Sequence, residues 1–157
     1  MVIISDRGDH MAVNIIFGFL FPWLFGMFFW KKDKRMVRKV VPFVSILSLI
    51  INTTGNKYWL VTPKLKKQQY LTTFPQNFGY FPMIGCLFIY TLYKKQTHTL
   101  FWTIVFAVVS SAVEFSAILF GKVKYRNGWT IIRTFFVYMC SLWLLHCYYT
   151  FFAKTKA

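Results

Sequence analysis

Two charged side chains lie inside apolar stretches of this sequence, and their types allow them to hold or move charge. Glu114 is the single carboxylate in VVSSAVEFSAILF, residues 108–120, and Arg133 lies in the apolar run that begins at Trp129. Charged groups are costly inside a bilayer, so they usually face the interior of a helix bundle and have a partner there. Glu114 and Arg133 are therefore the candidate site residues.

The depth of these two residues predicts that they form an ion pair. Glu114 lies six residues before Phe120, about 9 Å from that end of its run at 1.5 Å per helical residue. Arg133 lies four residues past Trp129, about 6 Å from the same boundary. The eight-residue turn GKVKYRNG joins the two runs, so their helices are expected to be adjacent and antiparallel. Three interpretations stay open: a structural ion pair, a proton or ion relay through Glu114, and snorkelling of both groups toward the interface.

Five apolar runs position these residues. Hydrophobic residues make up 57% of the 157-residue chain and aromatic residues 22%, more than one soluble core of this size can bury. A helix of 20 apolar residues spans roughly 30 Å, the thickness of a bilayer core. The sequence predicts an all-α, polytopic transmembrane helical bundle that forms a single integral membrane domain over residues 1–157. Its expected spans are residues 11–30, 37–60, 77–93, 100–120 and 129–152.

The first run carries small residues on nearly one face. Gly18, Pro22 and Gly26 recur at every fourth position. Small residues let a neighbouring helix approach closely, and a proline inside a span bends it. We therefore expect this face to pack against another helix and the span to be kinked near Pro22.

The second run is interrupted by NTTGNK, and three interpretations stay open. The first is a short helix that ends at residues 52–57, with Trp59 at the membrane interface. The second is a span that is broken around Asn52 and Gly55, and the third is a re-entrant segment. The polar and basic stretch that follows, residues 62–76, is predicted to be a loop.

Basic residues lie in short clusters between the apolar runs and give a formal net charge of +15. This pattern favours contact with anionic lipid headgroups over nucleic acid, because no segment is long enough to form a soluble basic face. KKDKRMVRK places six cations after the first run, whereas only Arg7 precedes it. The positive-inside rule therefore predicts a multi-pass protein of the cell membrane, with its N-terminus outside and its C-terminus in the cytoplasm.

Other reactive side chains form no recognisable motif. The three cysteines lie in apolar runs without a CxxC pair, and His146 beside Cys140 and Cys147 lacks a diagnostic metal spacing. With four acidic residues in the chain, there is little material for acid–base catalysis. We expect no metal and no cofactor, and a non-enzyme in preference to an enzyme.

The segment from about Tyr58 to Tyr149 resembles an uncharacterised family of small multi-pass membrane proteins of bacilli and clostridia. The resemblance is carried by WLVTP, NFGYFP, SSAVEF and the turn KVKYRNGWT. It implies a Gram-positive plasma membrane and an all-helical fold, and it makes Glu114, Gly128 and Trp129 part of the family pattern. Members often carry Asp at the position of Asn77.

These observations predict a membrane protein without enzymatic activity, with a structural or accessory role in the cell envelope. The reason is that one acid and one base are nearly all the polar chemistry that the apolar runs offer. The alternative is a small transporter or channel that uses Glu114, and a membrane-embedded enzyme acting on a lipid is a third hypothesis. The expected partners are the bilayer and its anionic headgroups, with a second copy of the chain or another membrane protein also possible.

Overall fold

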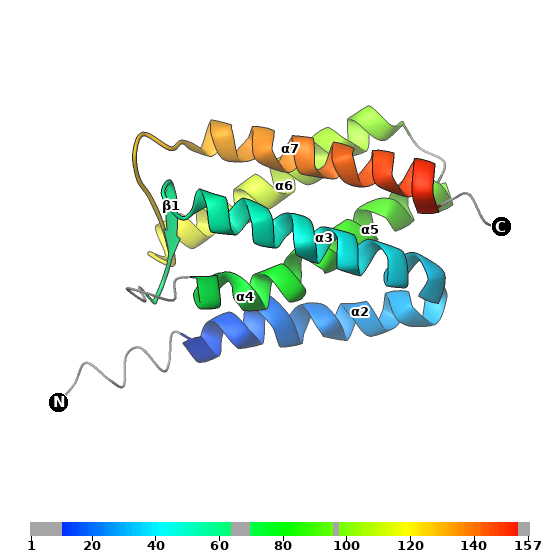
Figure 1. Ribbon diagram of the computed structural model, residues 1–157, viewed down its shortest axis with the longest axis horizontal. Helices are drawn as coiled ribbons and strands as arrows, with labels where there is room; N and C mark the ends of the chain where they lie inside the picture. Colours follow the sequence, from blue (N-terminus) through cyan, green and yellow to red (C-terminus); the bar gives the residue numbers. More distant parts are fainter. Residues whose placement is uncertain (1–10, 64–69, 96–97, 154–157) are drawn as a thin grey trace.

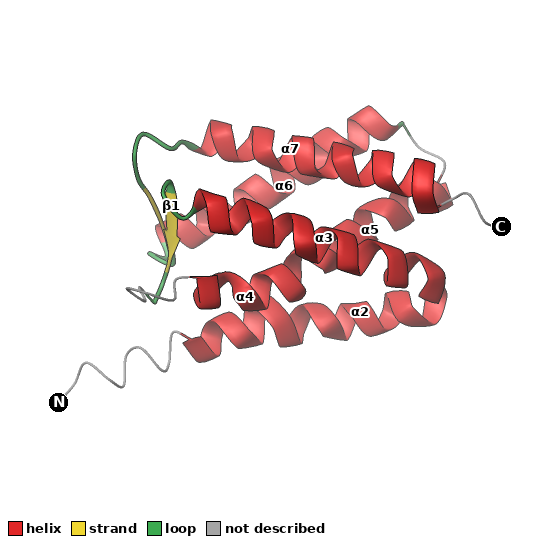
Figure 2. Ribbon diagram, in the orientation of Figure 1, coloured by secondary structure: helices red, strands yellow, loops and turns green. Residues whose placement is uncertain are grey.

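The computed structural model describes residues 11–63, 70–95 and 98–153 as one bundle of helices. The helices run back and forth between the two ends of the bundle, so that the first and last described residues lie at opposite ends (Figure 1). Among the described residues, four helices are long and apolar enough to cross a membrane, namely Met11–Lys32, Lys34–Gly55, Thr99–Leu119 and Ile131–Phe152. The predicted all-α helical bundle is confirmed, and Figure 2 shows how little of the fold is not helical.

The first helix contains a π-helical segment, η1 (Ile16–Leu20), followed by α2 (Phe21–Lys32). Pro22 at the start of α2 has no N–H to donate, and the widened π turn lies directly before it. Gly18, Pro22 and Gly26 are all buried, as their spacing predicted. A Cβ on Gly26 would meet the sulfur of Met83, so this face packs closely against the third crossing of the bundle, which comprises residues 70–95.

A single residue, Asp33, separates α2 from α3 (Lys34–Gly55). Its side chain accepts a hydrogen bond from the N–H of Met36 at 2.9 Å and so caps the start of α3. The two helices are therefore held in a tight antiparallel turn at the basic cluster. α3 runs without interruption through Asn52 and ends at Gly55, so the interpretation that breaks the second span around these residues is wrong.

The broken helix lies in the third crossing instead. α4 (Tyr70–Phe78) and α5 (Tyr80–Lys95) meet at Gly79, where a Cβ would collide with the carbonyl oxygen of Gly18. Side chains of two other helices donate hydrogen bonds to the last carbonyl groups of α4. The Trp23 indole donates to the Phe78 carbonyl at 3.0 Å, and Ser48 donates to the Asn77 carbonyl at 3.3 Å. A break at membrane depth is tolerated when protein surrounds it in this way.

The stretch predicted to be a loop, residues 62–76, is helical from Tyr70 onward. Polar composition suggested a loop, but Thr72 and Thr73 are buried and α4 packs against α3 and η1. Tertiary packing therefore makes this polar segment a helix. Residues 64–69 of the predicted loop lie outside the described residues.

A two-stranded antiparallel pair closes one end of the bundle. β1 (Trp59–Val61) follows α3, and β2 (Val123–Tyr125) follows α6 (Thr99–Leu119). Trp59 is paired with Tyr125 and Val61 with Val123. The sequence did not predict these strands. Their pairing holds the end of α3 beside the segment that connects α6 to α7 (Ile131–Tyr148).

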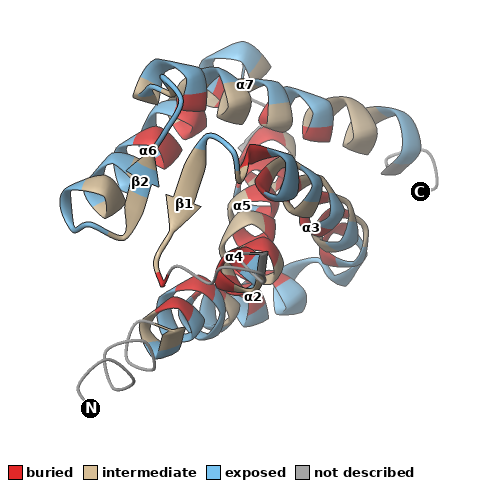
Figure 3. Ribbon diagram, turned by 60° about the vertical axis from the view of Figure 1, so that its left-hand side comes forward, coloured by how far each residue is buried: buried red, intermediate tan, exposed pale blue. Residues whose placement is uncertain are grey.

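The core is centred on α5, which packs against α2, α3, α6 and α7 (Figure 3). Cys86, Phe88 and Ile89 of α5 have no exposed surface. By contrast, large apolar side chains point outward, including Phe17 at 65% exposed and Leu24 at 60%. This inside-out surface needs lipid as its solvent.

Candidate functional site

Glu114 lies on the inner side of α6, where its carboxylate accepts hydrogen bonds from three hydroxyl groups. Tyr125 Oη donates to Oε1 at 2.6 Å, Thr134 Oγ1 donates to Oε1 at 3.2 Å, and Tyr138 Oη donates to Oε2 at 2.8 Å. An ionised carboxylate only accepts hydrogen bonds and has about four acceptor sites, so three of them are filled. Neutral donors therefore hold the carboxylate on three sides.

The turn before α7 positions the other members of this network. Asn127 and Gly128 both have positive φ, +50° and +69°, and the Trp129 N–H donates to the Arg126 carbonyl at 3.0 Å. These are the features of a type I′ turn, in which glycine is favoured. The turn brings the Trp129 indole N–H within 2.9 Å of Thr134 Oγ1. Gly128 thus acts in the structure as a turn residue, and Trp129 as a donor to the network.

Tyr125 approaches the network from strand β2. Its hydroxyl also lies 2.8 Å from Thr134 Oγ1. Burial, followed by the hydrogen bond to Glu114, raises the pKa of Tyr125 above its ordinary value of 10.0. The phenol therefore stays a neutral donor throughout the physiological pH range.

The structure does not join Glu114 to Arg133. The two helices are adjacent, as predicted, but within the described residues Glu114 has no cationic partner and Arg133 is exposed. Arg133 lies in the first turn of α7, one residue before Thr134, and one residue rotates a helical side chain by about 100°. Sequence reasoning gave a correct depth but not the side of α7 that faces α6. The predicted ion pair is therefore replaced by hydroxyl contacts.

A second polar network lies opposite Glu114 on α3 and α4. Asn52 Nδ2 donates to Asn77 Oδ1 at 2.6 Å, and the Trp59 indole donates to Asn52 Oδ1 at 3.2 Å. Asn77 is fully buried, and within the described part of the chain its Nδ2 has no hydrogen-bond partner. Trp59, which one interpretation placed at the interface, lies instead against Trp129, with 4.9 Å between ring centroids.

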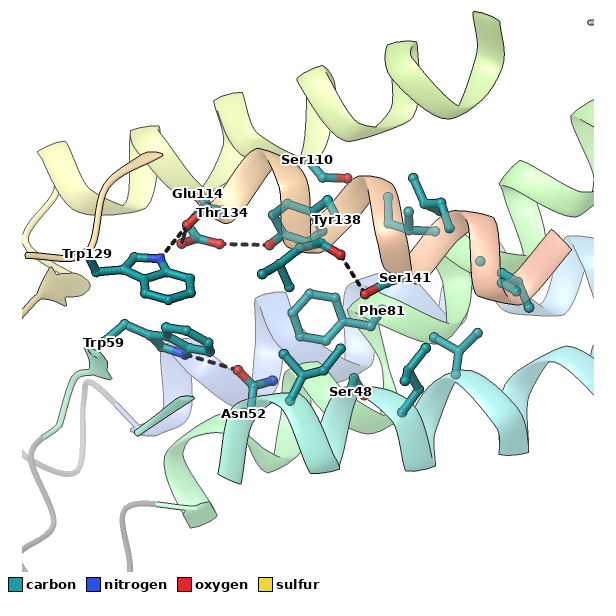
Figure 4. Close-up of a pocket in the computed structure, with 18 residues that line it drawn as sticks. Ser48, Asn52, Trp59, Phe81, Ser110, Glu114, Trp129, Thr134, Tyr138 and Ser141 are labelled. Atoms are coloured by element: carbon teal, nitrogen blue, oxygen red, sulfur yellow. Dashed lines mark hydrogen bonds between the residues drawn. The ribbon is translucent and has the colours of Figure 1, made fainter. Parts of the chain in front are cut away.

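A cavity of about 100 Å³ separates the two networks (Figure 4). Figure 4 shows Trp59 and Trp129 at one end, with Phe81 and Tyr138 farther along. The polar lining of the cavity comes from both sides of the bundle and consists of Ser48, Asn52, Ser110, Glu114, Thr134, Tyr138 and Ser141. A buried water needs about 10–15 Å³ of such volume, so the cavity can hold several waters or one small molecule.

A larger cavity of about 520 Å³ adjoins the first and reaches between η1 and α6. The two cavities share six lining residues: Asn52, Trp59, Phe81, Ser110, Glu114 and Tyr138. Exposed apolar residues such as Phe17 and Phe120 lie along the second cavity, so it opens on the lipid-facing surface of the bundle. Glu114 therefore lies at the junction of an inner cavity and a lateral opening.

This arrangement can bind a solute or pass a proton. Within the described ranges, no three His, Cys, Asp or Glu side chains come together to hold a metal ion. Cys140 is exposed, and Cys147 and His146 are half-buried outside the cavity. The chemistry that the cavity offers is one carboxylate, several hydroxyl and amide groups, and aromatic walls.

Sequence reasoning missed most of the side chains around Glu114. The spacing of Thr134 and Tyr138 at i and i+4 on α7 was a usable signal, because such residues share a helix face. Tyr125 and Trp59 gave no local signal, since a pairing between distant strands brings them to the site.

The chain matches none of the family models, curated proteins or solved structures with which it was compared. The resemblance to small membrane proteins of bacilli and clostridia stays a prediction.

Proposed function

We propose that this membrane protein is a small transporter that binds a solute in the cavity beside Glu114. The observation that carries the proposal is the position of the carboxylate. It lies between the inner cavity and the lateral opening, and its hydrogen-bond donors are three neutral hydroxyl groups. Intramembrane ionisable groups at cavities commonly mark substrate or proton pathways.

The broken third crossing supports the same proposal. Helices interrupted at membrane depth often form solute sites, because their backbone ends and polar side chains are available there. Here the break at Gly79 lies between Asn77 and Phe81, which face the second network and the cavity.

A structural or accessory role was the leading expectation from sequence because the spans offered so little polar chemistry. That premise changes because Asn52 and Glu114 both line the two cavities, and Asn52 is hydrogen-bonded to the buried Asn77. A purely structural bundle would be at least as stable with packed apolar side chains in these places. The accessory role is therefore the second candidate.

Reconstituted vesicles test the transport proposal. Purified protein in liposomes should carry protons or a small organic cation such as choline down an imposed gradient faster than empty liposomes, measured with an internal pH dye or a cation-selective electrode. Glu114→Gln should reduce the flux to the level of empty vesicles. Arg133→Gln is the matched control, because it removes a nearby exposed charge outside the cavity, and it should retain the flux. Equal fluxes from wild type, Glu114→Gln and empty vesicles would refute the proposal.

We also propose that the protein lies in a bacterial plasma membrane with its N-terminus outside. The support is that the basic turn around Asp33 and the end of α7 share one end of the bundle, opposite the strand pair (Figure 1). The positive-inside rule places that end in the cytoplasm. Single cysteines introduced at Lys34 and at Lys124 should react with an impermeant thiol reagent only at Lys124 in intact cells. Labelling only at Lys34 would reverse the orientation.

A further inference from the structure

We infer that the solute taken by the cavity beside Glu114 is a small organic monocation, of the kind that carries a substituted ammonium group. This inference rests on the proposed function, because it names the class of solute for the same cavity. Three features of the lining support it: an uncompensated carboxylate, aromatic walls and a shortage of free oxygen ligands.

The charge of the lining favours a cation. Among the described residues, no Lys or Arg lines the inner cavity, and Lys122 is the one cationic side chain that lines the adjoining cavity. The hydrogen-bond partners of Glu114 are the hydroxyls of Tyr125, Thr134 and Tyr138. These hydroxyls satisfy hydrogen-bonding capacity but do not neutralise a negative charge. A carboxylate in low-dielectric surroundings interacts strongly with a cation that reaches it. An anionic solute would be repelled, and a neutral one would leave the charge uncompensated.

The aromatic side chains favour a cation whose charge is diffuse. Trp59, Phe81, Trp129 and Tyr138 line the same cavity as Glu114. Aromatic rings attract cations through their quadrupole, and sites for substituted ammonium groups are commonly built from several such rings. Trp59 and Trp129 meet at an angle of 54°, so their rings form two differently oriented surfaces at one end of the cavity.

A bare metal ion suits this lining less well. Calcium takes six to eight oxygen ligands, and magnesium needs near-octahedral coordination. Three hydrogen bonds already engage the Glu114 oxygens, and no further carboxylate lines either cavity in the part of the chain that the structure describes. An alkylated ammonium group needs no such ligand set, because its surface is largely apolar.

The size of the cavity limits the ligand to a few heavy atoms. Its volume of about 100 Å³ is of the order of the engineered cavity of about 150 Å³ that binds benzene. A quaternary ammonium head with a short substituent is of this size. The adjoining cavity of about 520 Å³ gives such a molecule a route from the lipid-facing side.

Choline and its neutral carbon analogue 3,3-dimethylbutan-1-ol form a matched pair of probes, since they differ chiefly in charge. Binding to the purified full-length protein in detergent micelles is measured by titration calorimetry, with potassium chloride as a third probe. Choline should bind at least about tenfold more tightly than the alcohol, and potassium should not compete with it at equal concentration. Glu114→Gln should weaken choline binding by about 30-fold or more and leave the alcohol unchanged.

Phe81→Leu tests the aromatic contribution separately, because no hydrogen bond of the Phe81 ring is lost. It should weaken choline binding about two- to fivefold and leave the alcohol nearly unaffected, whereas Phe81→Trp should retain choline binding. Thermal unfolding of each variant confirms that it is folded before it is titrated.

Two kinds of result overturn the inference. If choline and the alcohol bind equally, or if Glu114→Gln leaves choline binding unchanged, the cavity is not a site for organic cations. If potassium displaces choline at equal concentration, the site takes inorganic cations instead. Either result leaves the transport proposal standing, provided that vesicle flux still depends on Glu114. Loss of that dependence is a separate result and refutes the transport proposal itself.

Discussion

Glu114→Gln and Tyr138→Phe, made singly and together, test whether hydroxyl groups hold the half-buried carboxylate. Tyr138 Oη donates to Glu114 Oε2 at 2.8 Å across the α6–α7 contact. A hydrogen bond to a charged group contributes about 1.5–3 kcal/mol, against about 0.5–1.5 kcal/mol for a neutral pair. Gln keeps an acceptor but removes the charge. The contribution of this hydrogen bond to the free energy of unfolding should therefore fall by roughly 1 kcal/mol. That value falls between the mean of about 0.6 and the maximum of about 1.7 kcal/mol for hydrogen bonds in a membrane protein.

The measurement is a double-mutant cycle on the free energy of unfolding in bicelles. The coupling energy between Glu114→Gln and Tyr138→Phe should be about 1 kcal/mol. Glu114→Gln combined with Arg133→Gln is the control, because Arg133 is exposed and makes no contact with the carboxylate. Its coupling should stay below about 0.5 kcal/mol, as for independent sites.

The opposite pattern would refute this reasoning. A coupling near zero with Tyr138, together with about 1 kcal/mol or more with Arg133, would mean that the ion pair suggested by sequence depth forms in the bilayer. The hydroxyl network around Glu114 would then not be the arrangement that stabilises the folded protein.

Three further predictions concern the backbone and one titrating group. Gly79→Ala should lower the free energy of unfolding by about 3 kcal/mol, measured by the same denaturation, because its Cβ would collide with backbone of η1. Gly128→Ala and Gly121→Ala should each lower the free energy of unfolding by about 1–2 kcal/mol, because both residues have positive φ and open space around a Cβ. Only Gly128→Ala should also alter the fluorescence of Trp129. The pKa of Tyr125 is higher in the folded than in the unfolded protein. Its contribution to the free energy of unfolding is therefore fully present below pH 10.0 and is lost as the pH rises further. Tyr125→Phe should flatten the alkaline fall in stability, and an unchanged slope would contradict the assignment.

Hydropathy predicted the helical bundle because long apolar runs have few alternatives in a bilayer. The same criterion assigned residues 70–76 of α4 to a loop, since Thr72 and Thr73 are polar but buried among other helices. One of the three interpretations of the second run placed a helix break at Asn52 and Gly55. That interpretation is wrong, because these residues share a buried face with Ser48 and α3 stays helical to Gly55.

For the site, the sequence identified Glu114 but not its partners. The helical rise predicted the depth of Arg133 but not the direction in which its side chain leaves α7. The next residue along the helix, Thr134, is the one that faces Glu114. Trp59 and Tyr125 are 66 residues apart and become neighbours only through backbone pairing of β1 with β2. Such a contact has no local signature, because both strands are three residues long.

The cost of the arrangement around Glu114 is itself an argument for function. Replacing a buried polar group with packed apolar side chains is often neutral or stabilising, so stability alone does not require a carboxylate there. The fold instead commits β2, the Asn127–Gly128 turn and α7 to supplying donors for it. It also leaves a cavity beside the carboxylate where a larger side chain would pack better. A charge held by neutral donors next to open volume is suited to a mobile cation, because a fixed Lys or Arg would occupy the position that the solute needs.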